Sequence, residues 1–368
     1  MVFPGEESKL LVNGGSRAEE VVGIWLFGCS IGVICMLAVG SFTRLTRSGL
    51  SMTDWKFTGT LPPSSDDVNR DMKIEEFKFI YRKEYEYRMW GRALGVMFAL
   101  PYSYFLHKGY ITLRLGLRLS FLFALGAGQG LIGWWVKSGL EEPPSEYSQP
   151  RVSPYRVAAH LTSAIAIFCG LVWNVISVYL PESQPPAESP TWVHAAKVRR
   201  LALPISVLVG LTAVYGAFVT GNDVAHAFNT FPKMGDTWIP QDIFEMKPLI
   251  HNFFKYTSTL QLGHCLLETA TLISVGILWL SSRKLKLAPR DVIGIAFGLA
   301  AIQVPVGIFV SLQSYQLDSL PDSETGLMRF VPQHGALSLL MYMLLLNHTV
   351  RRPSLPLLKS LPQVVKAH

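Results

Sequence analysis

The chain has 368 residues, of which 49% are hydrophobic and 16% are charged. In an ordinary soluble domain about a quarter of the residues are charged, so this composition excludes that class and indicates a membrane protein. The formal net charge of +7 does not indicate binding to nucleic acid, because the basic residues lie in loops between apolar stretches, where they orient membrane helices.

Eight stretches of the chain are apolar enough to cross a bilayer, whose core of roughly 30 Å is spanned by about 20 helical residues. In chain order they are residues 21–41, 89–107, 119–136, 157–180, 201–220, 265–281, 292–312 and 335–350. The sequence therefore predicts an all-α membrane protein with eight transmembrane helices.

Basic residues gather in three short loops and after the last apolar stretch. They are Lys108, Arg114 and Arg118, then Lys197, Arg199 and Arg200, then Arg283, Lys284, Lys286 and Arg290, and finally Arg351 and Arg352. With eight spans, all of them fall on one side, and basic short loops stay on the cytoplasmic or matrix side of a membrane. We therefore expect both termini and the 2–3, 4–5 and 6–7 loops on that side. The 1–2 loop is also basic, but long loops count for less in this rule.

The first 20 residues include glutamates at positions 6, 7, 19 and 20. Mitochondrial transit peptides are rich in arginine and poor in acidic residues, so this segment does not resemble one. Either a presequence is missing from the sequence or import uses internal signals.

The chain resembles itself at an offset of about 175 residues, and the agreement falls on polar residues and glycines. The matching pairs are Gln129 with Gln303, Gly133 with Gly307 and His160 with His334, each 174 apart, Gly40 with Gly216, 176 apart, and Tyr87 with His264, 177 apart. We therefore expect two repeated four-helix bundles, an N-terminal half over 21–180 and a C-terminal half over 199–350, joined by a proline-rich linker over 181–198. Residues 1–20 and 351–368 flank the two halves.

Each even-numbered span begins in a short polar motif with a side chain that can bind a metal ion. These side chains are Tyr87, His160, His264 and His334. Since odd and even spans run in opposite directions, all four lie on one side of the membrane, opposite the basic short loops. Each half then holds one pair, which is the minimum for clamping a porphyrin iron from both faces. This arrangement indicates heme.

Several loop motifs resemble those of the heme A synthase family, in its mitochondrial and proteobacterial form and especially in plants. The matching segments are 40–52 (GSFTRLTRSGLSM), 88–92 (RMWGR), 137–142 (KSGLEE), 150–153 (PRVS) and 229–235 (NTFPKMG). The resemblance extends from about residue 20 to the C-terminus. It identifies the chain as a member of that family.

The resemblance implies an oxidoreductase that oxidises the C8 methyl of heme O to the formyl of heme A, for assembly of cytochrome c oxidase. The N-terminal half would bind the substrate heme, and the C-terminal half would hold a permanent heme b that relays electrons from a ferredoxin-type donor. The implied location is the mitochondrial inner membrane, with lipid around the spans and both termini in the matrix. Cytochrome c oxidase assembly factors are implied partners, and a homo-oligomer is left open.

The second span departs from the family motif Glu-x-x-His-Arg, because Tyr87 stands at the histidine position. Two interpretations are open. As tyrosinate, with a pKa lowered by Arg88, Tyr87 could ligate heme iron, or it could only pack near the lipid headgroups. Glu84 is retained one helical turn earlier, where it could handle protons as a catalytic carboxylate or be an ordinary solvated side chain.

The other candidate ligands differ in how well they keep the family pattern. His160 retains the motif Arg-x-Ala-Ala-His. His264 is retained, but Gly263 and Cys265 replace the family's Asp and Arg, which removes a carboxylate that would hold the imidazole tautomer and a contact to a heme propionate.

In the last span the family reads His-Gln-x-Gly-Ala-Leu, and this chain has Pro332 at the histidine position. His334 lies two residues later, roughly 200° around an ideal helix. Pro332 permits an irregular turn before the helix begins, and such a turn would let His334 reach the iron. His226 in the 5–6 loop is a spare imidazole on the same side.

These changes leave a second hypothesis open, a catalytically impaired paralogue that acts as a heme-binding or assembly protein. A third, a transporter built from repeated bundles, is disfavoured because the polar motifs cluster at one membrane face and not at the midplane. Fold alone does not decide among them.

Overall fold

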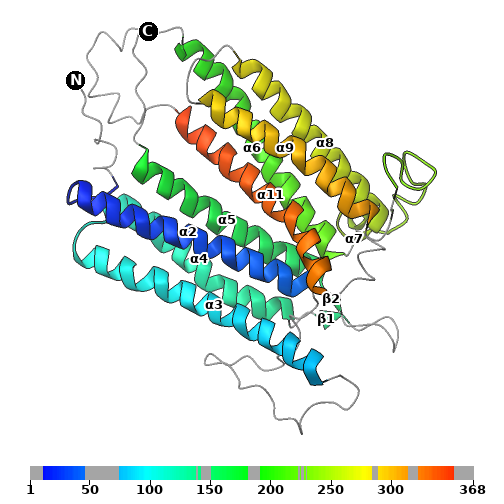
Figure 1. Ribbon diagram of the computed structural model, residues 1–368, viewed down its shortest axis with the longest axis horizontal. Coiled ribbons are helices and arrows are strands. Elements are labelled where there is room, and N and C mark those ends of the chain that lie inside the picture. The colour runs from blue at the N-terminus through cyan, green and yellow to red at the C-terminus, as the bar shows by residue number, and fades with distance from the viewer. Residues whose placement is uncertain are drawn as a thin grey trace.

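The computed structural model describes residues 11–45, 74–137, 140–141, 151–180, 191–222, 224, 228, 230–283, 289–313 and 322–351. Its long helices are α2 (Ser16–Leu45), α3 (Ile74–His107), α4 (Leu113–Lys137), α5 (Pro154–Tyr179), α6 (Thr191–Gly221), α8 (Thr257–Ser282), α9 (Pro289–Leu312) and α11 (Asp322–Thr349). A 3-10 turn η3 (Leu249–His251) and the short helix α7 (Asn252–Lys255) precede α8. Within these residues the protein is all-helical apart from one short strand pair, which confirms the predicted class (Figure 1).

The strand pair was not predicted and joins two of the loop motifs. Strand β1 (Leu140–Glu141) runs antiparallel to β2 (Arg151–Val152), with Leu140 opposite Val152. The pair lies at the end of the bundle where α5 begins (Figure 1). It therefore draws the connection between α4 and α5 together at that end.

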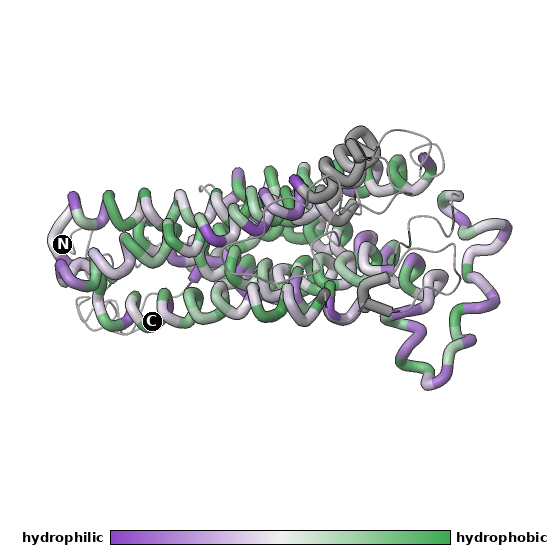
Figure 2. Tube along the Cα trace, turned by 90° about the horizontal axis from the view of Figure 1, so that it is seen from below, coloured by the Kyte–Doolittle hydropathy of each residue, from purple (hydrophilic) through white to green (hydrophobic). Residues whose placement is uncertain are grey.

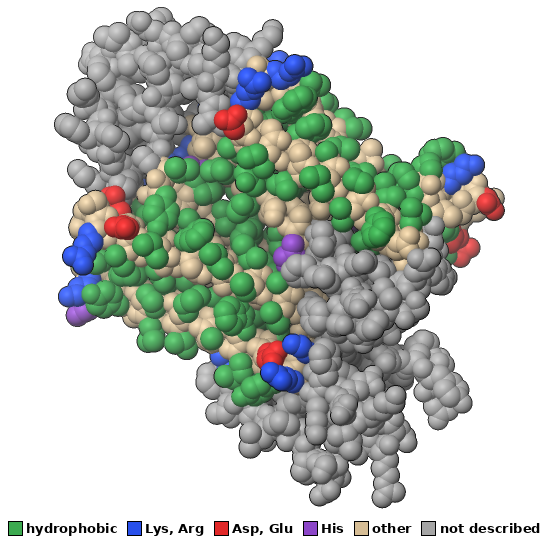
Figure 3. Space-filling model, in the orientation of Figure 1, with side chains coloured by type: hydrophobic (Ala, Val, Ile, Leu, Met, Phe, Trp, Pro, Cys, Tyr) green, Lys and Arg blue, Asp and Glu red, His purple; other side chains and the backbone are tan. Residues whose placement is uncertain are grey.

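The chain is a multi-pass membrane protein. Six segments of the described helices are long and apolar enough to cross a membrane, namely Ser16–Ser41, Leu113–Val136, Pro154–Tyr179, Ala196–Gly221, Thr257–Ser282 and Pro289–Leu312. The two other expected spans, 89–107 and 335–350, fall on α3 and α11 and are not among those six. Hydrophobic residues dominate along the helices, and one face of the molecule is covered by apolar side chains between charged ends (Figures 2 and 3).

Helix α11 corrects one expectation. It begins at Asp322 and runs as a continuous helix through residues 332 to 334, so the expected irregular turn before His334 is wrong. Prolines also lie inside α3, α6 and α9. Membrane helices tolerate proline because neighbouring helices and local adjustments satisfy the backbone groups that it frees.

The long helices pack as two rings. In the first ring α2 contacts α3, α3 contacts α4, α4 contacts α5, and α5 contacts α2. In the second, α6 contacts α8, α8 contacts α9, α9 contacts α11, and α11 contacts α6. The order places α3 diagonally opposite α5, and α8 diagonally opposite α11. The rings join through the contacts of α5 with α6, of α5 with α11 and of α2 with α11 (Figure 1).

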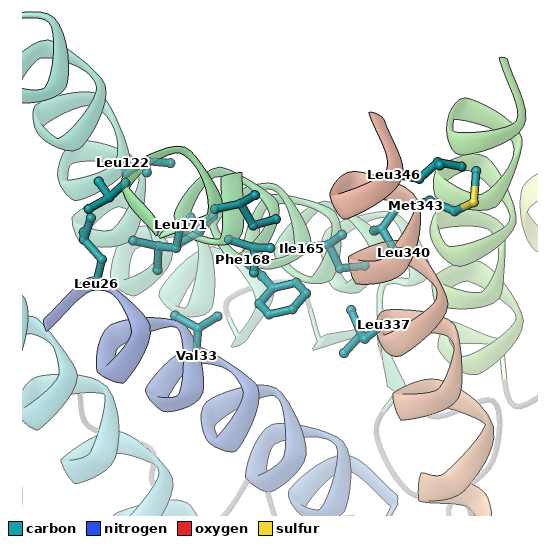
Figure 4. Close-up of a cluster of buried hydrophobic side chains, with 14 of the residues drawn as sticks. Leu26, Val33, Leu122, Ile165, Phe168, Leu171, Leu337, Leu340, Met343 and Leu346 are labelled. Carbon is teal, nitrogen blue, oxygen red and sulfur yellow. The ribbon is translucent and has the colours of Figure 1, made fainter. Parts of the chain in front are cut away.

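The centre of the molecule is an apolar cluster around α5. Phe168 is 1% exposed and lies between Val33 of α2 and Leu337 of α11 (Figure 4). Leu171 and Leu122 continue the cluster toward α4 (Figure 4). Since lipid is as apolar as these side chains, close packing rather than hydrophobicity holds such helices together.

A polar contact also links α5 to α11 at the end where both helices finish. His348 Nε2 lies 3.1 Å from Ser177 Oγ, and both residues are buried. The ring of Trp173 meets His348 edge-on with centroids 5.2 Å apart. One residue earlier, Asn347 donates to Ser206 Oγ of α6 at 2.5 Å. Two helices of one ring are thereby tied to a helix of the other.

Candidate functional site

The structure brings Tyr87 and His160 together across the first ring. Tyr87 Oη from α3 lies 3.4 Å from His160 Nε2 from α5. The other two helices contribute glycines at the same level. A Cβ on Gly40 of α2 would lie 3.0 Å from Tyr87 Cε2, and one on Gly133 of α4 would lie 3.8 Å from His160 Cε1. Two facing side chains therefore meet on one diagonal, and two small residues make room for them on the other.

Glu84 belongs to the same end of α3 and is buried, with an exposed fraction of 3%. Arg88 donates to its carboxylate over 2.5 Å, one helical turn along α3. The interpretation of Glu84 as a solvated carboxylate is therefore wrong. The guanidinium of Arg88 therefore forms an ion pair with the carboxylate of Glu84.

A second set of ion pairs lies on α3, just before Tyr87 in the chain. Glu86 accepts hydrogen bonds from Arg82 at 2.9 Å and from Lys83 at 3.1 Å. Burial alone would raise the pKa of Glu86, but these hydrogen bonds lower it below the ordinary value. Pairs at these spacings stabilise the first part of α3, which continues as a helix beyond the apolar stretch.

His264 lies in the second ring on α8, 177 residues after Tyr87. Its Nε2 is 3.1 Å from Glu268 Oε1, one turn further along α8. A Cβ on Gly216 of α6 would lie 3.4 Å from His264 Cε1, and one on Gly307 of α9 would lie 3.7 Å from Glu268 Oε2. Glycines from the two neighbouring helices again leave space beside the candidate ligand.

The opposite nitrogen of His264 is buried with no hydrogen-bond partner among the described residues. Tyr215 of α6 stacks on the imidazole with centroids 6.5 Å apart. A Cβ on Gly263 would lie 2.5 Å from Tyr215 Oη, so the tyrosine fills the space of a side chain at position 263. From the sequence we expect that glycine at position 263 removes a carboxylate partner of the imidazole. In the structure His264 Nδ1 is the nitrogen without a partner among the described residues.

His334 is half-buried on α11, diagonally opposite α8. Its carbonyl oxygen accepts a hydrogen bond from Ser338 at 3.0 Å. Next to it, the side-chain amide of Gln303 on α9 presses against Gly335, where any added Cβ would collide with it. His334 therefore lies on the expected helix, α11, whereas the side chain of His264 contacts Glu268 and Tyr215.

Two residues of the second site were missed from the sequence, Glu268 and Tyr215. Glu268 follows His264 by four residues, a spacing that puts two side chains on one helix face, so this signal was available. Tyr215 has no such signal, because its position depends on the packing of α6 against α8. His226 lies outside the described residues.

The segment before α8 closes the same end of the second ring. The carbonyl of Phe228 accepts hydrogen bonds from Gln261 of α8 at 3.0 Å and from Ser311 of α9 at 3.2 Å. Thr230 Oγ1 accepts from the backbone of Gly235, whose φ of +67° favours glycine, so this part of motif 229–235 forms a tight turn. The motif therefore has a structural role in this loop.

Tyr256 fixes the start of α8 against the loop. Its hydroxyl donates to Asp242 at 3.0 Å and to Glu245 at 3.1 Å. The hydrogen bond to Asp242, then burial and the bond to Glu245, raise the pKa of Tyr256 to about 12. The phenol is therefore held as a neutral donor.

The facing side chains of the first ring are of the kinds that hold a flat iron cofactor. Imidazole nitrogen and phenol oxygen are both known axial ligands of heme iron. The 3.4 Å between Tyr87 Oη and His160 Nε2 is close to the roughly 4 Å that separates two donors bonded to one metal ion at about 2 Å each. Among the described residues, no group of three or more His, Cys, Asp or Glu side chains could hold a bare metal ion.

Comparison with known proteins agrees with this chemistry. Residues 23–319 match the COX15-CtaA family model, described as cytochrome oxidase assembly protein. A protein of Arabidopsis thaliana named heme A synthase COX15 is 61% identical, with 99% of this chain and 82% of that protein aligned. Heme A synthase COX15 of Homo sapiens is 37% identical over 91% of this chain and 84% of its own length. Heme A synthase of Nitrosospira multiformis is 35% identical over 91% and 94%.

Proposed function

Because the chain belongs to the COX15-CtaA family of cytochrome oxidase assembly proteins, we propose that it is a heme A synthase. The reaction is oxidation of the C8 methyl of heme O to the formyl of heme A, for use in cytochrome c oxidase. The observation that carries the proposal is the meeting of Tyr87 and His160 across the first ring, between glycines from the other two helices. The names of the aligned relatives support the same activity.

The proposed architecture is a repeat of two four-helix bundles, residues 21–180 and 199–350, joined by the linker 181–198. Segments 1–20 and 351–368 flank them. The equal order of helix contacts in the two rings supports this division. So does the equivalence of two contacts, Gly40 with Tyr87 and Gly216 with His264, at the offsets found in the sequence.

In the N-terminal half, His160 and Tyr87 would hold the iron of the substrate heme from opposite faces. The heme supplies the chemistry that activates oxygen, and the protein supplies orientation and proton handling. Glu84 lies one helical turn from Tyr87 and is the carboxylate that would accept or deliver a proton. Its ion pair with Arg88 keeps the carboxylate at a fixed position on α3.

In the C-terminal half, His264 and His334 would hold a heme b that relays electrons to the first site. Their helices, α8 and α11, stand diagonally opposite, as α3 and α5 do in the first ring. We propose a ferredoxin-type protein as the electron donor. The location is the mitochondrial inner membrane, with both termini in the matrix. Assembly factors of cytochrome c oxidase and membrane lipid are the further partners, and a homo-oligomer is compatible with this assignment.

Expression in cells that lack their own heme A synthase tests the function. We expect extracted hemes to include heme A, and the variant His160→Ala to lose it while the protein still accumulates in the membrane. A reduced-minus-oxidised spectrum and a pyridine hemochrome assay on the purified protein report bound heme separately. Bound heme without heme A would instead identify a non-catalytic heme-binding protein.

A further inference from the structure

The contact between His264 and Glu268 sits at the ligand nitrogen of the proposed heme b site. Glu268 Oε1 lies 3.1 Å from His264 Nε2, and neither side chain is more than 30% exposed. Gly216 and Gly307 bring the backbones of α6 and α9 close to the two side chains. The pair is therefore half-buried between α6 and α9, where an ionic hydrogen bond is stronger than in water.

A hydrogen bond to a carboxylate determines which imidazole nitrogen carries the proton. An ionised carboxylate can only accept, so His264 Nε2 must donate and must carry the proton. A protonated nitrogen has no lone pair to offer to iron, because metal ligation needs the unprotonated nitrogen. Binding of iron at Nε2 therefore requires the proton to move from Nε2 to Nδ1.

A proton that moved to His264 Nδ1 would not gain a hydrogen bond in place of the one lost at Nε2. The Nδ1 atom is buried and has no hydrogen-bond acceptor among the described residues. A proton placed there would leave a buried donor unsatisfied, and such a group is costly. Histidines that ligate metals ordinarily donate this second N–H to a carboxylate, a carbonyl or water. At His264 the carboxylate is on the other nitrogen.

We propose that Glu268 holds His264 in the tautomer that cannot ligate iron through Nε2, and so limits heme binding in the C-terminal half. The inference rests on the proposed function, since it takes heme as the ligand of this site. The N-terminal half has no such device in the equivalent position, because Glu268 corresponds to Gly91 at the offset of 177 residues. His160 Nε2 faces instead a hydroxyl, which can donate as well as accept.

Titration of purified protein in detergent micelles with hemin, followed at the Soret band, tests the proposal. The background is His160→Ala, which removes the better ligand of the first site. In that background we expect Glu268→Ala to tighten hemin binding by roughly tenfold to a hundredfold, the range for loss of a hydrogen bond to a charged group. The matched control Glu20→Ala, at the other end of the bundle on α2, should leave the affinity unchanged.

Further variants separate failure of the inference from failure of the proposed site. Adding His264→Ala to the Glu268→Ala protein should remove the gain. Equal or weaker hemin binding after Glu268→Ala would overturn the inference, with the proposed site intact if His264→Ala alone weakens binding. If His264→Ala alone has no effect, the proposed heme b site itself fails. The nearly isosteric Glu268→Gln covers the case that the alanine variant does not fold, and it should show a smaller gain in affinity.

Discussion

Tyr87 faces His160 through an oxygen that is both a hydrogen-bond partner and a possible iron ligand. The charged residue next to it, Arg88, is turned to Glu84 and forms a buried ion pair. At this site the tyrosine is therefore positioned by packing against Gly40. The positive charge of Arg88 stabilises the carboxylate of Glu84. These two relations can be separated by mutation, because they involve different side chains: Tyr87 contacts Gly40 and His160, and Arg88 contacts Glu84.

Substitution of Tyr87 tests whether its oxygen works in the reaction. Tyr87→Phe removes only the hydroxyl, and we expect heme A formation to fall at least about tenfold, the usual effect of removing an interaction worth about 1.4 kcal/mol in the transition state. Tyr87→His restores an imidazole and should keep or raise the yield. Heme A extracted from complemented cells is the measurement. Full activity of the phenylalanine variant would show that Tyr87 only packs.

The ion pair of Glu84 with Arg88 is expected to matter for stability as well as for the reaction. Arg88→Met removes the cation from a carboxylate that is 3% exposed, and breaking a buried pair in this way costs about 3–5 kcal/mol. Thermal unfolding in detergent should show the loss. The double variant Glu84→Gln with Arg88→Met should recover much of it, and equal melting of the wild type and Arg88→Met would refute the assignment.

Among the elements, α3 and α11 extend well beyond the apolar stretches that indicated them. Every apolar stretch falls on a long helix, because hydropathy locates the segment that lipid must cover. Hydropathy does not report where a polar helix continues into water. The charged residues before position 89 are good helix formers, and the Arg82 to Glu86 spacing was a local signal for that continuation.

Part of the candidate site could also be predicted from the sequence, and part could not. The repeat and the position of polar residues at helix starts predicted that Tyr87 and His160 belong together, although 73 residues separate them. The contact of Tyr215 with position 263 could not be predicted, since it depends on how closely α6 approaches α8. The same holds for the continuous helix at residue 332, because proline in a membrane helix has no fixed outcome.

The close packing of α4 against α5 can be tested by substituting glycines on the two helices. A Cβ on Gly170 would lie 2.5 Å from Cδ2 of the buried Leu122, whereas a Cβ on Gly126 of α4 meets nothing within 4 Å. Gly170→Val should therefore destabilise the protein by about 1–3 kcal/mol, as overpacking does. The control Gly126→Val should change the melting temperature little. Equal effects of the two variants would contradict the packing described here.

For the whole molecule, the helix directions place the described start of α2 and the end of α11 at one end of the bundle. The starts of α5 and α8, the helices that carry His160 and His264, lie at the other end (Figure 1). Tyr179 at the end of α5 donates to the carbonyl of Glu20 near the start of α2, which agrees with that placement. The basic residues Lys108, Arg283 and Arg351 follow the ends of α3, α8 and α11. All three thus belong to the end opposite the site.

The predicted orientation across the membrane rests on those charges. We expect a C-terminal tag to be protected in mitoplasts and to become accessible to protease only when the inner membrane is opened. A tag placed in the loop between α6 and α8 should be digested in intact mitoplasts. Digestion of the C-terminal tag from the intermembrane-space side would reverse the orientation.

The ring packing has a consequence for how this protein can change over generations. Each ring holds one candidate ligand on a helix that also joins the rings, α5 or α11. The other candidate ligand lies on an outer helix, α3 or α8, whose main contacts with long helices are in its own ring. Residues on an outer helix, such as those at positions 87, 263 and 265, can therefore be substituted without a change in the distance between the two sites. Changes at one candidate site can therefore accumulate while the packing between the two rings is kept.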